Sequence, residues 1–204
     1  MAVVESSSSL SVSLPSGLSG PRPGLGVTLI CGPAGGGKSR WAEHLATLSG
    51  RQVVYLATGP LLPDDADWQR RLDRHRRRRP PHWICREVGG DLAAAVSPLS
   101  SGQIALIDSL GTWVAAWLDC GAAEWQQRCG ELREALRGCT APLLLVCEEV
   151  GWGVVPSTAE GGRFRTRLAE LEQRLMADAS AAWLVIAGRA LDLQALSVPV
   201  PAEP

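Results

Sequence analysis

The sequence predicts a three-layer α/β domain built around a mainly parallel sheet, and three observations support this prediction. Short apolar runs alternate along the chain with segments whose apolar residues recur every three or four positions. Runs bounded in this way are typical of strands buried on both faces, which belong to parallel sheets covered by helices. The chain also has 204 residues, 46% of them hydrophobic, which suits one domain with one core.

Five apolar runs are predicted to be buried strands, at Val27–Cys31, Val53–Ala57, Ile104–Ile107, Leu143–Cys147 and Trp183–Ala187. Three segments between them have the spacing of amphipathic helices, with apolar faces formed by Trp41, Leu45 and Leu48, by Trp125, Cys129, Leu132 and Leu136, and by Phe164, Leu168, Leu171 and Leu175. Gly50 follows the first helix and Pro142 precedes the fourth strand, where a helix is expected to have ended. Strands and helices in alternation predict right-handed crossover connections.

The two ends of the chain differ from the folded body in composition. Residues 1–26 are rich in Ser, Pro and Gly, and we expect a disordered tail because such a segment buries too little apolar area to offset its ordering entropy. The folded domain is expected to span residues 27–193, followed by a C-terminal tail over residues 194–204.

Charge and cysteine content exclude several classes of protein. A net charge of −1 argues against a nucleic-acid binder that relies on bulk positive charge. No segment approaches the ~20 apolar residues of a membrane span. Six cysteines form no C-x-x-C pair, so we expect a cytoplasmic protein with reduced, mostly buried thiols and no structural zinc.

A glycine-rich loop follows the first predicted strand and fits the phosphate-loop pattern G-x-x-x-x-G-K-[ST]. It comprises Gly32, Pro33, Ala34, Gly35, Gly36, Gly37, Lys38 and Ser39. The glycines let successive N–H groups point at phosphate oxygens, and the following helix adds its positive end. The only lysine of the chain, Lys38, would reach the β- and γ-phosphates. A glycine-rich turn without a ligand is the alternative.

Asp108 is the candidate acid for a magnesium site. It stands directly after the strand Ile104–Ile107, where its carboxylate would complete the site begun by the Ser39 hydroxyl. Alternatively, Asp108 caps the next helix, with Ser109 beside it.

Seven arginines lie between Arg70 and Arg79, with His75 among them. The segment is open to three interpretations: an arm that binds phosphates through bidentate contacts, a nucleic-acid patch, or a solvated charged helix partly paired with neighbouring aspartates. Arginines disfavour the cationic imidazole, so His75 would be a nucleophile able to carry a nucleotidyl group, or else an ordinary surface histidine. His44 and His82 are interpreted as structural.

Seven segments of the chain together resemble a known family. They read, in order, GPAGGGKSRWAEHLA, VVYLATG, RRLDRHRRRRPPHW, ALIDSLGTWV, LLLVCEEVGWGVVP, GRFRTRLAELEQRL and WLVIAGRALDL. Their order and spacing resemble the bifunctional adenosylcobinamide kinase/adenosylcobinamide-phosphate guanylyltransferases of cobalamin biosynthesis, from about Val27 to Leu193. The block from Glu149 to Pro156 is the most distinctive, because it is not part of the general phosphate-loop pattern.

The resemblance implies a RecA-like phosphate-loop (P-loop NTPase) fold, Mg²⁺, a corrinoid substrate and a homo-oligomer, expected to be a trimer. It implies phosphorylation of adenosylcobinamide with ATP or GTP, followed by transfer of GMP from GTP through a histidine. Lys38 and His75 are then the catalytic residues, and Ser39 and Asp108 the metal ligands. The implied nucleotide contacts are Gly32 to Ser39, Ala57, Thr58, Gly59, Arg76, Arg77, Arg78, Arg79, Glu87 and Asp108.

The chain departs from the family's usual residues at several positions. Gly35 and Gly36 replace Arg-Ser, Ser109 replaces a cysteine, and three usual asparagines are replaced by Ala116, Glu148 and Glu172. Losing an amide that pairs with a buried polar group costs ~1–3 kcal/mol. A non-catalytic or single-activity nucleotide-binding relative is therefore the alternative function.

Overall fold

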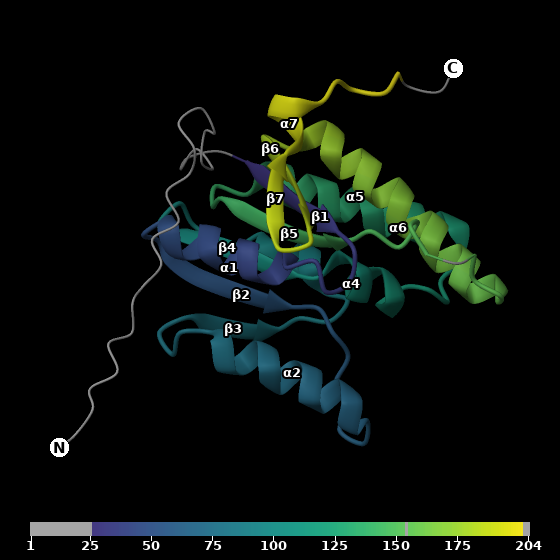
Figure 1. The fold of residues 1–204 in the computed structure, drawn as a ribbon, viewed down its shortest axis with the longest axis horizontal. Helices are drawn as coiled ribbons and strands as arrows, with labels where there is room; N and C mark the ends of the chain where they lie inside the picture. Colours follow the sequence, from purple (N-terminus) through teal and green to yellow (C-terminus); the bar gives the residue numbers. More distant parts are fainter. Residues whose placement is uncertain (1–25, 154, 202–204) are drawn as a thin grey trace.

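The computed structural model describes residues 26–153 and 155–201, and within these ranges seven strands form one sheet in the order β3-β2-β4-β5-β1-β6-β7 (Figure 1). Strands β1 to β6 are parallel, and β7 pairs antiparallel with β6. The strands are β1 (Val27–Gly32), β2 (Gln52–Ala57), β3 (Ile84–Glu87), β4 (Gln103–Asp108), β5 (Leu143–Glu148), β6 (Ala181–Ile186) and β7 (Arg189–Asp192). The predicted mainly parallel sheet is confirmed.

All five predicted strands are present, as β1, β2, β4, β5 and β6. The sequence prediction missed β3 and β7. All four residues of β3 are exposed, and β7 reads Arg-Ala-Leu-Asp without a buried position. Both strands lie at the edges of the sheet. An edge strand needs no apolar run, so hydrophobic patterning gives no signal for it.

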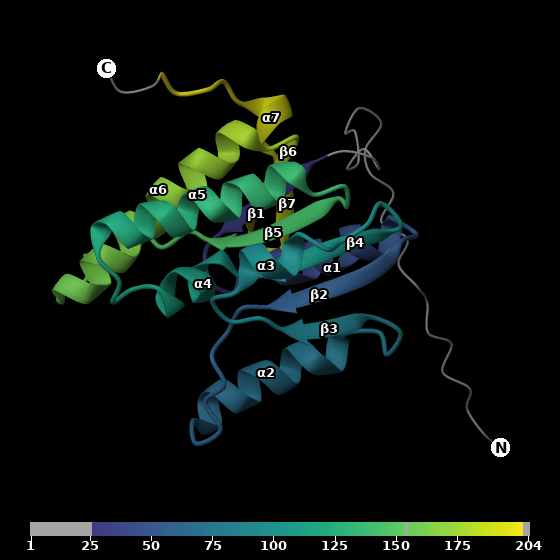
Figure 2. The same ribbon diagram turned by 180° about the vertical axis from the view of Figure 1, so that it is seen from behind.

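Helices cover both faces of the sheet (Figures 1 and 2). One core cluster joins α1 to one face, through Ala42, Leu45 and Trp183, and a larger cluster joins α3, α4, α5 and α6 to the other. The helices are α1 (Lys38–Leu48), α2 (Ala66–Arg78), α3 (Leu92–Val96), α4 (Leu110–Ala116), α5 (Ala122–Gly138), α6 (Ala159–Asp178) and α7 (Leu193–Leu196). The three-layer prediction is confirmed.

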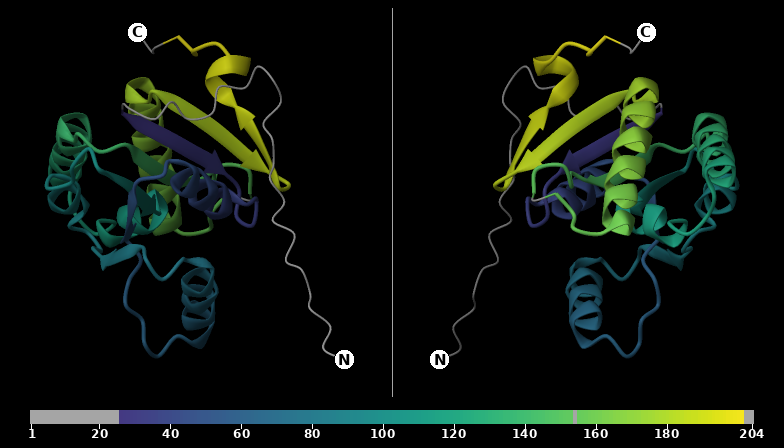
Figure 3. Two further views of the ribbon diagram at one scale, coloured as in Figure 1. Left: turned by 90° about the vertical axis from the view of Figure 1, so that its left-hand side faces the viewer. Right: turned by 90° about the vertical axis from the view of Figure 1, so that its right-hand side faces the viewer.

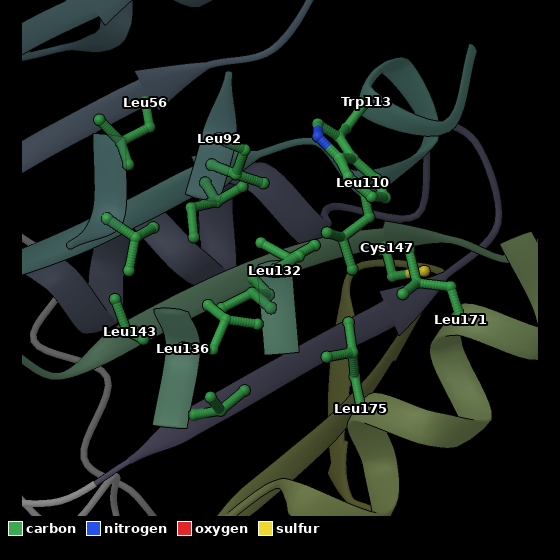
Figure 4. Packing of buried hydrophobic residues seen from close by; sticks show 14 of the residues in the cluster. Leu56, Leu92, Leu110, Trp113, Leu132, Leu136, Leu143, Cys147, Leu171 and Leu175 are labelled. Carbon is green, nitrogen blue, oxygen red and sulfur yellow. The ribbon is translucent and has the colours of Figure 1, made fainter. Parts of the chain in front are cut away.

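The larger core shows why the predicted helical spacing matters. In Figure 4, Leu132 and Leu136 of α5 and Leu171 and Leu175 of α6 point toward the sheet, and all four side chains are buried. Burying a leucine side chain contributes about 1.5–3 kcal/mol, so these helices are held mainly by their apolar faces.

Helix α2 stands apart from the body and lies beside β3 at the end of the sheet (Figure 3). It has no residue in either apolar core cluster. The arginine segment of the sequence therefore forms a helix that is attached mainly through polar contacts, described below.

The predicted tails lie largely outside the described residues. Residues 1–25 are not described, so the expected N-terminal tail and the domain bounds 27–193 stay predictions. The segment expected as a C-terminal tail begins inside α7, whose first turn is capped by the Asp192 carboxylate.

Across residues 26–153 and 155–201, no helix has the length and apolarity to cross a membrane. All six cysteines are free thiols. Cys31, Cys129 and Cys147 are buried, Cys120 and Cys139 are half-buried, and Cys85 is exposed.

Candidate active site at the carboxyl ends of the strands

The glycine-rich loop joins β1 to α1 and packs directly on β6. Gly32, Gly35 and Gly37 have positive φ angles of 146°, 73° and 110°, which side chains disfavour. A Cβ on Gly36 would lie 2.5 Å from the Val185 carbonyl oxygen. The loop therefore requires glycine both for its curvature and for its close approach to β6.

Lys38 is buried at the first position of α1. Its side chain is only 7% exposed, and Nζ donates a hydrogen bond of 2.9 Å to the Pro33 carbonyl oxygen across the loop. The ammonium thus lies within the loop that the sequence assigns to phosphate, where it can exchange this carbonyl for phosphate oxygens.

Asp108 lies at the end of β4, separated from the loop strand β1 by β5. The Tyr55 hydroxyl donates a hydrogen bond of 2.7 Å to its Oδ2. His75 Nδ1 lies 3.5 Å from the same oxygen. Burial by itself raises the pKa of Asp108, but hydrogen bonds from His75, Tyr55 and Ser39 outweigh it, so the pKa lies below its ordinary value. Asp108 is therefore a carboxylate at neutral pH.

The Ser39 side chain helps to lower the pKa of Asp108, so the two predicted metal ligands lie close together. Both offer hard oxygen atoms, which suit Mg²⁺, and Mg²⁺ is usually held by one or two protein ligands together with phosphates and water. No group of three or more His, Cys, Asp or Glu side chains in the described ranges could hold a metal on its own. The residues present fit a magnesium ion that arrives with a nucleotide.

His75 lies on the half-buried side of α2 and faces the site. Besides its arginine neighbours in the sequence, His75 has the Asp108 carboxylate as a neighbour in the structure. Arg78 Nη2 lies 3.4 Å from His75 Nδ1. Since Nδ1 faces both Asp108 and Arg78, Nε2 is the ring nitrogen left for a reaction.

Arg78 and Arg79 fasten the end of α2 to the body. Arg78 makes a bidentate pair with Glu43 of α1, at 3.1 and 2.9 Å, and the Arg79 guanidinium lies 3.5 Å above the Tyr55 ring centre. The Glu43 hydrogen bond raises the pKa of Arg78. These two predicted phosphate ligands are therefore already engaged with the protein.

Arg76 and Arg77 remain on the exposed side of α2. Arg76 lies 3.7 Å from Asp73 and 3.7 Å from Glu87, and Arg77 has no ion pair within the described part of the chain. Arg70 also pairs with Asp67. These contacts match the solvated, partly paired helix among the three interpretations of the segment.

The strand ends next to Asp108 form the walls of one cavity. Its lining includes the predicted nucleotide contacts Ala57, Gly59 and Glu87 together with His75 and Asp108. Thr58, another predicted nucleotide contact, does not line the cavity. It is buried, and its hydroxyl donates a hydrogen bond of 2.6 Å to the Ser109 carbonyl oxygen. The structure thus brings together every predicted strand-end residue, with Thr58 behind the surface.

Sequence reasoning missed Tyr55, Glu43 and Glu148 as organising residues. Tyr55 carried a signal, since it is the only tyrosine and interrupts an otherwise apolar strand with a hydroxyl that must find a partner. Glu43 carried no such signal in the sequence, because glutamates are common on the exposed surfaces of helices.

The chain is similar in sequence to a known protein family over most of its length. The family described as cobinamide kinase / cobinamide phosphate guanyltransferase matches residues 28–193. The chain belongs to the cobinamide kinase / cobinamide phosphate guanyltransferase family. The kinase activity in the family's description agrees with the phosphate loop between β1 and α1.

Two bifunctional relatives match this chain over nearly their whole length. The bifunctional adenosylcobalamin biosynthesis protein CobP of Pseudomonas aeruginosa is 36% identical, over 81% of this chain and 96% of the relative. The bifunctional adenosylcobalamin biosynthesis protein CobU of Escherichia coli is 33% identical, over 79% of this chain and 96% of the relative.

A solved structure supports the phosphate-loop fold of this family member. A prototypical ATPase from the type III secretion system of pathogenic bacteria superposes with a TM-score of 0.54 at 10% identity, over 79% of this chain and 51% of that chain. This likeness shows the fold alone.

Two of the departures from the usual family residues contact each other. Glu148, at the end of β5, accepts hydrogen bonds from the Ser109 hydroxyl and, at 2.9 Å, from the Gly111 N–H. Thr58 in turn accepts from the Ser109 N–H at 2.9 Å. Both carboxylate oxygens of Glu148 therefore accept hydrogen bonds from the residues that follow Asp108.

Glu172 of α6 is a third departure and lies behind the site. Burial raises its pKa to about 7, partly opposed by a hydrogen bond from the Cys31 thiol, and the charge of Glu149 raises it further. This carboxyl is not hydrogen-bonded to the loop or to Asp108, so its effect is expected on stability.

Proposed function

We propose that the chain phosphorylates adenosylcobinamide with ATP or GTP and then transfers GMP from GTP to the product through a guanylylated His75. The observation that carries this proposal is the position of His75, 3.5 Å from Asp108 at the end of β4. One site thereby combines the parts for phosphoryl transfer with a nucleophile for nucleotidyl transfer. Family membership supports both reactions.

In the kinase step, the protein mainly positions and neutralises charge. Lys38 and the loop N–H groups bind the phosphates, and Ser39 and Asp108 would hold Mg²⁺. When bound, Mg²⁺ would neutralise charge on the β- and γ-phosphate oxygens. Asp108, kept ionised by its hydrogen bonds, is also placed to accept a hydrogen bond from an approaching hydroxyl group.

In the guanylyl step, the His75 Nε2 lone pair attacks the α-phosphorus of GTP. The bond between this phosphorus and the β-phosphate oxygen breaks, and pyrophosphate leaves with its electron pair. A phosphate oxygen of the phosphorylated corrinoid then attacks the same phosphorus and releases His75. Asp108 orients the imidazole by accepting a hydrogen bond from Nδ1–H, which leaves the lone pair on Nε2.

Intact-protein mass spectrometry tests this function. The chain is incubated with GTP and Mg²⁺ and quenched at alkaline pH, where a phosphoramidate survives and acid-sensitive loss can be checked separately. We expect a GMP-sized adduct that is absent in His75→Asn. The matched control His82→Asn, an exposed histidine on the loop before β3, keeps the adduct. An adduct that persists in His75→Asn contradicts the assignment.

Nucleotide binding without an adduct or kinase turnover would instead favour the non-catalytic alternative. The homo-oligomer, expected to be a trimer, the corrinoid partner and the cytoplasmic location stay predictions. Light scattering of the purified chain tests the oligomer directly.

A further inference from the structure

A second cavity lies beside the phosphate loop, away from Asp108 and His75. It is lined by residues of the phosphate loop, α1, β6, the β6–β7 turn and β7, among them Gly37, Arg40, Trp41, Val185, Gly188 and Arg189. Its volume is about 190 Å³, several times the ~30 Å³ that one water occupies in the liquid. In the sheet, β6 and β7 lie on one side of the loop strand β1, and β4 and β2 on the other.

The walls of this cavity are fixed to the loop. The Gly188 N–H donates a hydrogen bond of 3.1 Å to the Gly36 carbonyl oxygen. A Cβ on Gly37 would lie 3.6 Å from Val185 Cγ1 and 3.9 Å from Gly188 Cα. The β6–β7 turn therefore holds a constant position relative to the residues that would bind phosphate.

Two guanidinium groups flank the cavity. Arg40 folds over the loop, since its Nη2 lies 3.5 Å from the position of a Cβ on Gly37, and Arg189 enters from β7. Neither arginine has an ion pair among residues 26–153 and 155–201. Arg76 and Arg78, on the Asp108 side, are by contrast paired with carboxylates. Unpaired guanidinium groups suit a ligand that carries phosphates and a flat ring.

Trp41 supplies an aromatic wall. Its indole packs edge-on against Trp183, and its Nε1 is buried without a hydrogen-bond partner in the described part of the chain. A nucleobase can stack on an indole or a guanidinium plane and offers acceptors for such an N–H group.

The loop and its neighbours would set the orientation of a bound triphosphate. Ser39 and Asp108 fix the end with the β- and γ-phosphates on the β4 side, whereas Gly37 and Arg40, at the start of α1, border the second cavity. The α-phosphate and its nucleoside then leave the loop on the β6 side. Building on the proposed function, we propose that this cavity binds the base and ribose of the nucleoside triphosphate that donates phosphate in the kinase step.

One consequence concerns the guanylyl step. His75 lies on the β4 side of the loop, so the guanosine joined to it occupies a different place from the nucleoside of the kinase donor. A single phosphate loop then serves two nucleoside sites on opposite sides of it.

Binding measurements separate the nucleoside contribution from the phosphate contribution. The probes are inorganic tripolyphosphate, which occupies only the loop, and the α,β-methylene analogues of ATP and GTP, which cannot guanylylate His75. All are titrated with Mg²⁺ into the full chain, Arg189→Ala and Arg40→Ala. Arg163→Ala, an exposed arginine on α6, is the matched control.

We expect Arg189→Ala to weaken the tighter-binding methylene analogue about tenfold, as for loss of one charged contact, and tripolyphosphate less than twofold. Equal losses for both probes, or no loss for either, overturn the assignment of the cavity. Tripolyphosphate binding also shows that a variant is folded at the loop. Failure of the unaltered chain to bind any probe would instead contradict the proposed function.

Discussion

Individual residues in this site have partners that fix their chemical state. Asp108 is buried, yet its pKa is lowered because Tyr55, His75 and Ser39 donate hydrogen bonds to it. Burial and the neighbouring Asp108 charge raise the pKa of Tyr55, so its hydroxyl stays protonated and keeps donating. A charged acceptor surrounded by donors is the state in which Asp108 can hold a cation and orient His75.

Lys38 provides the sharpest test at the residue scale. Lys38→Ala removes the ammonium that neutralises the transferred phosphate, so kinase kcat should fall at least ~100-fold. Lys38→Arg should not restore it, because a guanidinium fork does not fit the closed loop in which Nζ lies 2.9 Å from the Pro33 oxygen. Steady-state kinase assays with adenosylcobinamide measure both variants, and circular dichroism controls for folding. Undiminished turnover in Lys38→Ala would remove this role.

Polar side chains tie elements to one another at the strand ends, in addition to the apolar packing of the core. Arg78 and Glu43 join α2 to α1, and Glu148 joins β5 to the turn between β4 and α4. The turn carries Asp108, so its position depends on an acid from the neighbouring strand. A Cβ on Gly111 would contact the Glu148 carboxylate, so a larger residue there would have to displace this side chain.

We expect Glu148 to act as a positioning residue at the element scale. Glu148→Ala leaves Ser109 and Gly111 without an acceptor, which should lower stability by about 1–3 kcal/mol. Kinase kcat should fall about tenfold, with little change in nucleotide KM, because Asp108 is displaced while the loop is intact. Glu148→Gln keeps an acceptor oxygen and should recover most of kcat. A Gln variant as impaired as the Ala variant would contradict positioning through these hydrogen bonds.

A buried carboxyl group, that of Glu172, affects the stability of the whole molecule because its ionised form is unfavourable in the folded state. Glu172 of α6 faces Cys31 of β1, Cys147 of β5 and Glu149, and its pKa of about 7 exceeds the model-peptide value of 4.5. Both buried thiols also have raised pKa values, so they are neutral near pH 7. The folded state therefore binds more protons than the unfolded state between these two pH values.

Global stability should fall as the pH rises from about 4.5 to about 7 and then level off, because ionising Glu172 is easier in the unfolded chain. Glu172→Gln removes this dependence and should stabilise the protein at pH 8 by on the order of 2 kcal/mol, with little gain at pH 4.5. Urea unfolding across this pH range measures the difference. Glu170→Gln, exposed on the same helix, is the control. A gain that does not vary with pH would refute the linkage.

Much of the site was predictable because its signals are local. The phosphate loop, Lys38, Ser39 and Asp108 follow from a motif and from the end of an apolar strand, and the buried strands follow from hydrophobic runs. The roles of Glu43 and Glu148 were not predictable, because each depends on a partner more than 30 residues away. No local pattern specifies which distant groups a polar side chain will meet.

The sequence by itself determined the alternation of strands and helices, the phosphate loop and the family, since these depend on residue order and short spacings. The tertiary structure decided the strand order that separates Asp108 from the loop strand by β5. It also decided the docking of α2, which places His75 against Asp108. The physical reason is that strand order and helix docking arise from contacts between distant segments, whose free energies depend on three-dimensional packing and charge pairing.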